Sequence, residues 1–440
     1  MLINLINNKK KEIFFIILLI IFFYRSPFIF LSGRFMAEEG AIYFANAYKF
    51  GFLYSIFFVD LTSGYLNLWA NISGIIANIF SLKFAPLVSN YLALIPKILI
   101  IYLALYNKSF LLNKFKHQVL FCFLVFISPL NVPEIWLNSI NSQIFFGIIS
   151  YILVFVKYKE NEINYFHLIL VFMAGLSGIY SCILLPLFFL KYLFYKNKQN
   201  FLNFISIFIC TIIQLSLILF SKLSNTLYEQ KLHSINFDIL INYIYNVLIK
   251  GFLGTSLTKY LYFNFFAYKI NLYLISIIII LIFVIISFFF YNLLNKKKLL
   301  NADNSFVIIS SIYSLVATSL IVMVGAVGDY VGGRYAALPT FYTLMIIFIL
   351  FIIFTNLKIK YFFLVLLTTS IVTGFYEFRP PTKNVKHQYI KYLDCVNCPN
   401  WENEITNFQE NRNYLLKIWP YPKKNMSLNL FFILFKTLKN

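Results

Sequence analysis

The sequence predicts an all-α polytopic membrane protein, and three observations support this fold class. Of the 440 residues, 60% are hydrophobic and only 12% are charged, whereas soluble domains have roughly 45–50% apolar and 25% charged residues. Apolar runs long enough, or nearly long enough, to cross a bilayer recur along the chain. Lysines cluster in the short segments between these runs, as expected of cytoplasmic loops. Most of the chain is therefore expected to lie in lipid.

About eleven of these runs are expected to be transmembrane helices. They cover residues 13–32, 84–106, 117–131, 142–157, 163–178, 180–195, 201–221, 270–294, 305–326, 335–356 and 361–376. With the lysine clusters inside, the N-terminus is cytoplasmic and the tail is extracytoplasmic. The outer loops are then 31–83, 131–141, 222–269 and 327–334. This predicts a transmembrane bundle over 1–376 and a small extracytoplasmic tail over 377–440.

The formal net charge of +21 would suggest a nucleic-acid partner in a soluble protein. Here the lysine clusters follow the membrane pattern, and no basic, aromatic strip or nucleic-acid motif accompanies them. We therefore expect membrane lipid as a partner and no nucleic acid.

The five cysteines divide into two groups. Cys122, Cys182 and Cys210 lie in apolar runs, where cysteine behaves as a small hydrophobic residue. Cys395 and Cys398, in LDCVNCPN, suit a redox pair, half of a zinc site or a short disulfide. A second zinc half-site is missing, and an extracytoplasmic tail would meet an oxidising compartment, so we predict a local disulfide.

The first outer loop is expected to carry two interfacial helices within residues 38–80. The first covers 39–50 and ends at Gly51, and Gly64 precedes the second, YLNLWANISGIIANIF at 65–80. Asn67, Asn71, Gly74 and Asn78 recur at helical spacing and form one polar stripe, which favours a helix on the outer surface. The alternative is a spanning helix whose asparagines line a cavity. That alternative would place the lysines at 108–116 outside, against the lysine rule.

Glu38 and Glu39 stand together in RFMAEEGAIYFANAYKFG, immediately after the first apolar run, in a chain with only 16 acidic residues. One interpretation is that they begin a helix, where carboxylates interact favourably with the macrodipole. The other is that a carboxylate at the mouth of the bundle acts as a general base, because partial desolvation raises its pKa toward a useful range.

Three further polar clusters fall on the same outer face. Asp329 and Arg334 lie in GAVGDYVGGRYAALP, where the guanidinium suits phosphate oxygens or pairs with the aspartate. The amides in PEIWLNSINSQIFFG suit sugar hydroxyls or helix packing, and Tyr180 occupies a tight turn in GLSGIYSCILLP. The amide candidates for substrate binding are Asn138, Asn141 and Gln143.

The chain resembles bacterial multispanning proteins of the GT-C glycosyltransferase superfamily. The resemblance covers most of 13–356 and is carried by RFMAEEGAIYFANAYKFG, SGYLNLWANI, NSINSQIFFGIISYIL, GLSGIYSCILLPLFFL and GGRYAALPTFY. It implies a GT-C-like fold in the bacterial inner (plasma) membrane, with Glu38 and Glu39 at the active site. Many relatives have an aspartate where Glu39 stands. It further implies that Arg334 holds the donor phosphate, and Tyr65 joins the substrate-binding residues.

The implied activity is transfer of a sugar from a polyprenyl-phosphate donor to an envelope glycan, lipid or protein acceptor on the extracytoplasmic face. Some members of the superfamily use a divalent cation such as Mg²⁺ or Mn²⁺, which Glu39 would help to bind. Two alternative functions stay open. One is a flippase or transporter of lipid-linked sugars, and the other is an enzyme like an O-antigen polymerase or ligase.

Overall fold

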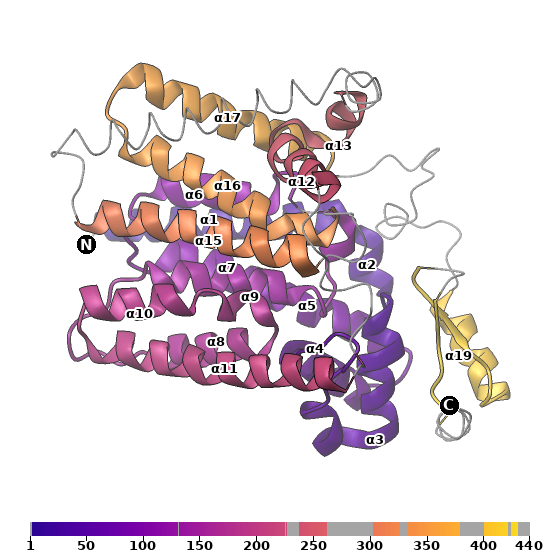
Figure 1. Ribbon diagram of the computed structural model, residues 1–440. Coiled ribbons are helices and arrows are strands. Elements are labelled where there is room, and N and C mark those ends of the chain that lie inside the picture. The colour runs from indigo at the N-terminus through magenta and orange to yellow at the C-terminus, as the bar shows by residue number, and fades with distance from the viewer. Residues whose placement is uncertain are drawn as a thin grey trace. The chain divides into compact units, whose positions relative to one another are not determined.

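The computed structural model describes residues 2–130, 132–224, 226, 237–261, 302–325, 332–378, 400–420 and 424–429. Nearly all regular structure in these ranges is helical (Figure 1), which confirms the predicted class of an all-α membrane protein. The exception is a small antiparallel pair of strands in the tail, β1 (Leu416–Ile418) and β2 (Lys424–Met426).

The chain divides into two compact units. The first comprises 1–108, 132–231 and 379–440, and the second comprises 109–131 and 232–378. The described helices of the first unit are α1 (Leu2–Arg25), α2 (Pro27–Ser32), η1 (Glu39–Phe44), α3 (Ala45–Ile56), α4 (Leu68–Ile79), α5 (Ala85–Tyr106), η2 (Pro133–Ile135), α7 (Ser142–Val154), α8 (Tyr165–Leu176), α9 (Ile179–Cys182), α10 (Leu185–Phe194), α11 (Lys198–Leu223) and α19 (Trp401–Glu410). Those of the second unit are α6 (Phe115–Phe126), α12 (Phe237–Tyr243), η3 (Ile244–Ile249), α13 (Lys250–Leu261), α15 (Ala302–Gly325), α16 (Arg334–Ile353) and α17 (Leu357–Tyr376).

Five described helices are long and apolar enough to cross a membrane, namely α5, α11, α15, α16 and α17. A sixth crossing results if α8 and the α9–α10 segment, which are bent by 116° at their junction, form one broken span. Other predicted spans are shorter than their apolar runs: the run 13–32 is divided at Pro27 between α1 and α2, and α6 and α7 have 12 and 13 residues. The predicted span 270–294 lies outside the described residues.

Helix α7 forms the centre of the first unit, because all 13 of its residues are buried. It packs against α5, α8 and α9, and a helix that is apolar all round belongs inside a bundle. By contrast, only 22% of the 18-residue apolar stretch of α11 is buried. Helices α8 and α11 lie side by side (Figure 1).

Helix α16 has the same central role in the second unit, because 72% of its 18-residue apolar stretch is buried. It packs against α15, α17 and η3. In helix α17, only 17% of the corresponding 18-residue stretch is buried.

Among the described residues, each unit has one π-helix that continues into an α-helix broken at a glycine. In the first unit η1 leads into α3, which is interrupted at Gly51 with φ 73° and ψ −169°. In the second unit η3 leads into α13, interrupted at Gly254 with φ 73° and ψ −179°. A positive φ at this position favours glycine, so these two residues end one helical direction and start another.

The first loop contains two helical segments, as its sequence predicts, and Gly64 precedes the second. The first does not end at Gly51 as expected, because the helix only changes direction there and continues to Ile56. Helix α4 has 12 residues, which corresponds to about 18 Å and is too short to span roughly 30 Å of hydrocarbon. The amides of its asparagine stripe donate to backbone carbonyls. Asn71 donates to the carbonyls of Ile56 and Phe58, and Asn78 donates to that of Ala47. These two residues therefore join α4 to α3 and the residues that follow it, while Asn67 donates to the Ile140 carbonyl before α7.

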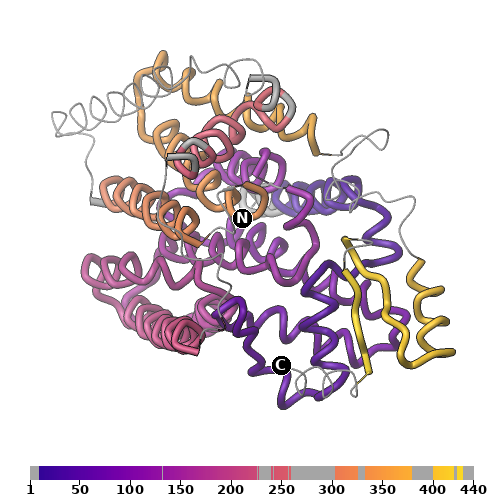
Figure 2. Tube along the Cα trace, turned by 45° about the vertical axis from the view of Figure 1, so that its right-hand side comes forward, coloured from indigo at the N-terminus to yellow at the C-terminus, as the bar shows by residue number. Residues whose placement is uncertain are grey.

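The tail packs against this loop (Figure 2). Trp401 contacts Phe35 edge to face, with ring centroids 5.6 Å apart, and its indole N–H donates to the Leu82 carbonyl. A shared hydrophobic cluster joins the two parts, and its buried tail members are Phe408, Leu416, Ile418, Met426 and Leu428. The tail and the first loop consequently lie on the same side of the membrane. The predicted disulfide between Cys395 and Cys398 lies outside the described residues.

Cysteine labelling tests the predicted orientation. Lys108 and Asn425 are both exposed, so each should react readily with a thiol reagent that reaches it. In a background with Cys395 and Cys398 replaced by serine, we expect an impermeant reagent added outside to label Asn425→Cys and to spare Lys108→Cys until the membrane is opened. The remaining cysteines are buried and should react slowly. Labelling of Lys108→Cys in intact cells would contradict this orientation.

Candidate functional site

The loop between α2 and η1 carries both acidic residues and has a constrained backbone. Gly33 leaves α2 with φ 65°, and a Cβ there would lie 2.4 Å from the Leu87 nitrogen, so only glycine fits. Asn90 of α5 then holds the peptide at Arg34, accepting from its N–H at 2.7 Å and donating to its carbonyl at 3.1 Å. The chain turns at Ala37, with φ 46°, immediately before Glu38.

Glu39 is buried, with 2% of its surface exposed, and both of its carboxylate oxygens are engaged. Its Oε1 accepts from the Ser89 hydroxyl at 2.8 Å and from the Ser139 N–H and hydroxyl at 2.8 and 2.7 Å. Its Oε2 accepts from the Met36 N–H at 3.1 Å. One carboxylate thus joins the first loop, α5 and the loop before α7.

Burial raises the pKa of Glu39, because the charged form loses hydration, although the hydrogen bonds from Ser139, Ser89 and Met36 oppose this effect.

The loop before α7 has a second left-handed residue that is not glycine. Leu137 has φ 47°, and its carbonyl accepts from the Asn90 side chain at 2.8 Å. Ala37 lies two residues before Glu39, and Leu137 lies two residues before Ser139, which donates to Glu39. Such conformations cost of order 1–3 kcal/mol and persist only where neighbouring contacts fix them. The two loops are therefore held in an unfavourable backbone geometry around the carboxylate.

Two buried cations lie beside this region. The Arg25 guanidinium lies 4.4 Å and the Lys97 ammonium 5.5 Å from the centroid of the buried Trp136 ring. Lys97 also lies 3.9 Å from the centroid of Phe145 and donates to the Ala93 carbonyl. The sequence interpretation had no role for Arg25, Ser89, Ser139 or Lys97.

Glu38 differs from its neighbour in exposure. Its side chain is 37% exposed, and its Oε1 lies 3.5 Å from the ammonium of Lys424 in β2. The backbone of the preceding residues pairs with the tail, since Ala37 donates to the Trp419 carbonyl and Trp419 donates to the Phe35 carbonyl. The exposed carboxylate thus sits between the first loop and the tail.

The predicted amide residues lie together in the first unit. Gln143 donates to the Tyr65 hydroxyl at 3.0 Å, and Gly178, two residues before Tyr180, packs against Gln143. Asn138 donates to the Met36 sulfur and its oxygen accepts from the Ile140 N–H. Asn141 donates to the Glu134 carbonyl, while its buried Oδ1 has no partner among the described residues.

Arg334 begins α16 in the second unit, where its guanidinium lies 5.2 Å from the Tyr335 ring centroid. Its predicted partner Asp329 lies outside the described residues.

No cation site is evident at Glu39 in this arrangement. Its two oxygens already accept four hydrogen bonds, so a cation would have to displace those donors. Nor do three or more His, Cys, Asp or Glu side chains come together among the described residues. A divalent cation at Glu39 would therefore require these donors to move, and a cation elsewhere stays a prediction from the resemblance.

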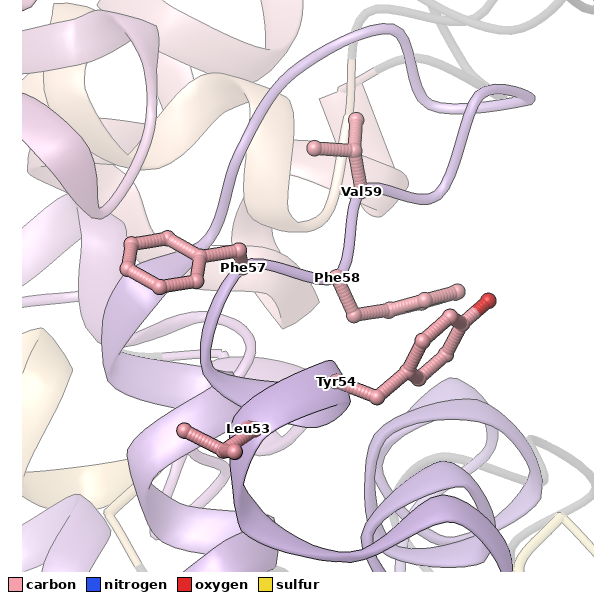
Figure 3. Close-up of a pocket in the computed structure, with 5 residues that line it drawn as sticks. All are labelled: Leu53, Tyr54, Phe57, Phe58 and Val59. Atoms are coloured by element: carbon pink, nitrogen blue, oxygen red, sulfur yellow. The ribbon is translucent and has the colours of Figure 1, made fainter.

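An open hollow lies where α3 ends (Figure 3). It has a volume of about 380 Å³ and is lined by Leu53, Tyr54, Phe57, Phe58 and Val59. The Tyr54 and Phe58 rings lie side by side, with centroids 6.2 Å apart. This apolar lining suits a hydrocarbon chain better than a sugar.

Replacement of each glutamate by glutamine should separate their structural roles. Glu39→Gln places an amide N–H₂ where one carboxylate oxygen accepts, so a buried donor loses its partner, at a cost of about 1–3 kcal/mol. Glu38→Gln removes only an exposed ion pair, and we expect about 1 kcal/mol or less. Thermal unfolding of the purified protein measures both. Equal stability of the two variants would contradict the anchoring role of Glu39.

The raised pKa of Glu39 also predicts a pH dependence. Between the ordinary pKa of a glutamate and the raised value, the folded state binds the proton more tightly than the unfolded state, so stability should fall as pH rises. Melting temperatures of wild type and Glu39→Gln should therefore differ by an amount that changes with pH across this window. The difference between wild type and Glu38→Gln serves as the control, because it should not follow the titration of Glu39. Parallel curves for wild type and Glu39→Gln would refute the assignment.

Comparison of the chain with known proteins finds no matching family model, no matching curated protein and no matching solved structure.

Proposed function

We propose that the protein is an integral membrane glycosyltransferase that uses a polyprenyl-phosphate-linked sugar and acts on the extracytoplasmic face. The observation that carries the proposal is the unequal carboxylate pair: Glu39 is buried and fully hydrogen-bonded, while Glu38 is exposed on the same loop. A carboxylate held at a fixed place with access to a substrate hydroxyl is what a general base requires. We also propose that the chain has a GT-C-like arrangement of eleven transmembrane spans.

The reaction is a displacement at the anomeric carbon. The acceptor hydroxyl oxygen bonds to that carbon, the bond from the carbon to the phosphate oxygen breaks with its electron pair, and lipid phosphate leaves. Glu38 takes the hydroxyl proton, and Glu39 positions the loop that carries Glu38. The acceptor is an envelope glycan, lipid or protein, and Asn141, Gln143 and Tyr65 offer hydrogen bonds to sugar hydroxyls.

The prenyl chain has a suitable surface on the same unit. The hollow at 53–59 is apolar, and the exposed side chains around it are large and hydrophobic, including Phe52, Leu53 and Phe57. Asn71 fixes the carbonyls of Ile56 and Phe58 and so ties this segment to α4. A lipid-borne substrate could thus keep its chain in the membrane while its head group meets the first loop.

A flippase of lipid-linked sugars is the second candidate, and one observation favours it. Arg25 and Lys97 are buried with Glu39 in the bundle, and ionisable groups at membrane depth often mark transport pathways. The two functions differ in product. A strain lacking the transferase should lack one sugar in its envelope glycan, whereas a strain lacking the flippase should accumulate complete glycan units on inner-leaflet lipid.

Glu38→Gln tests the general base. The substitution keeps the size of the side chain and removes its basicity, so we expect sugar transfer in proteoliposomes to fall about 10²–10⁴-fold at normal protein level. Glu402→Gln is the matched control, because Glu402 is an exposed carboxylate in the same tail interface. Transfer at the wild-type rate by the variant lacking both Glu38 and Glu39 carboxylates would leave the flippase as the better account.

Arg334→Lys tests the predicted phosphate contact. Lysine keeps the charge but loses the planar fork of the guanidinium, so use of the donor should weaken more than use of the acceptor. The exposed Arg412 supplies the control substitution Arg412→Lys. The measurement is the apparent KM for each substrate, and unchanged donor KM in both Arg334→Lys and Arg334→Ala would remove Arg334 from the donor site.

A further inference from the structure

Lys424 is the cationic residue that the tail places at Glu38. Its ammonium lies 3.5 Å from Glu38 Oε1, and its side chain is 46% exposed. The position does not depend on this contact alone. Strand β2 pairs with β1, and the residue after β1, Trp419, is hydrogen-bonded to both Phe35 and Ala37 of the first loop.

The tail is anchored independently by buried groups. Glu404 is buried, and its Oε2 accepts from the Tyr414 hydroxyl and from the Lys417 N–H, which fixes β1 against α19. Ile418 packs against Gly40 of η1, where an added Cβ would lie 3.4 Å from the Ile418 methyl carbon. The backbone that carries Lys424 is therefore held beside Glu38 even when the ion pair is open.

The ion pair itself is weak. An exposed pair at 3.5 Å in high dielectric gains little over separate hydration of its members. A phosphate group competes well for the same ammonium, because it has several acceptor oxygens and carries one or two negative charges.

We propose that Lys424 exchanges partners during the reaction, pairing with Glu38 in the resting protein and with the lipid phosphate when substrate is bound. The inference rests on the proposed function. While Lys424 is paired, it occupies Glu38 Oε1; when it turns to the phosphate, that oxygen can accept the acceptor hydroxyl proton. Arrival of the phosphate thus frees Oε1 of the exposed Glu38 for proton transfer.

The charge change during transfer matches this exchange. The donor is a phosphate diester with one negative charge, and the leaving polyprenyl phosphate is a monoester with about 1.5 to 2 negative charges near neutral pH. As the bond from the anomeric carbon to oxygen breaks, charge grows on the phosphate oxygen. An ammonium held there stabilises the transition state more than the bound donor.

Binding of farnesyl phosphate, with farnesol as its uncharged counterpart, tests the exchange in the full-length protein in nanodiscs. Wild type should prefer the phosphate. Lys424→Gln should reduce this preference about five-fold, the factor for one exposed charge contact, and Lys424→Arg should retain most of it. Lys83→Gln is the matched control, because Lys83 forms an exposed ion pair with Glu402 in the same interface, and it should leave the preference unchanged.

Glu38→Gln provides the decisive measurement, because it frees Lys424 from its resting partner. Farnesyl phosphate should bind severalfold more tightly to Glu38→Gln than to wild type, and the gain should vanish when Lys424→Gln is added. A merely structural ion pair would give no gain. An unchanged preference in Lys424→Gln, no gain in Glu38→Gln, or no binding of either compound overturns the proposal. If these binding results are obtained but the protein transfers no sugar, the proposed transferase activity is rejected, while the phosphate site at Lys424 is supported.

Discussion

The geometry of the candidate site depends on a buried carboxylate that three separate segments share. Glu39 receives hydrogen bonds from Met36 on its own loop, from Ser89 on α5 and from Ser139 before α7. A buried charge with unsatisfied oxygens would be costly, so the carboxylate is stable in this position only when all of these donors are present. This single group sets the positions of the two loops. The left-handed backbone conformations of Ala37 and Leu137 are consistent with that constraint.

The same interaction separates two roles that adjacent glutamates would otherwise share. Glu39 is engaged on both oxygens and cannot reach a substrate without losing those bonds. Glu38 is exposed, and one residue of separation turns it toward the tail. The buried side chains of Lys97 and Arg25 both lie against the ring of Trp136. Their presence within an otherwise apolar bundle limits how far the helices can move apart without exposing charge to lipid.

The sequence predicts the helical class and the two helices of the first loop, because hydrophobic pattern is a local signal. Glycine chemistry marks the change of direction at Gly51, but it does not show that the helix continues beyond it to Ile56. Helix length was less predictable: an apolar run does not show where Pro27 divides it or that α6 and α7 end early.

The partners of the carboxylates were not predictable, because they come from distant segments. Ser89, Ala93 and Lys97 share one face of α5 at four-residue spacing, and a lysine in an apolar run was a usable signal. Nothing local to Asn67, Asn71 and Asn78 shows that their amides bind backbone carbonyls rather than water. The role of the tail depends on packing between residues 35–40 and 401–428, which no periodicity encodes.

The pairing of the tail with the first loop has a consequence for biosynthesis. The contact between Glu38 and Lys424 joins residues 386 positions apart, so it closes almost the entire chain into one loop. Contacts of such high sequence separation form late, and chains are completed from the N-terminus during synthesis. The bundle can therefore be inserted in the membrane for some time before this contact exists, and the acidic loop acquires its final surroundings only after the tail has been synthesised. A newly inserted protein would pass through an immature stage in which helices are in place and the site is incomplete.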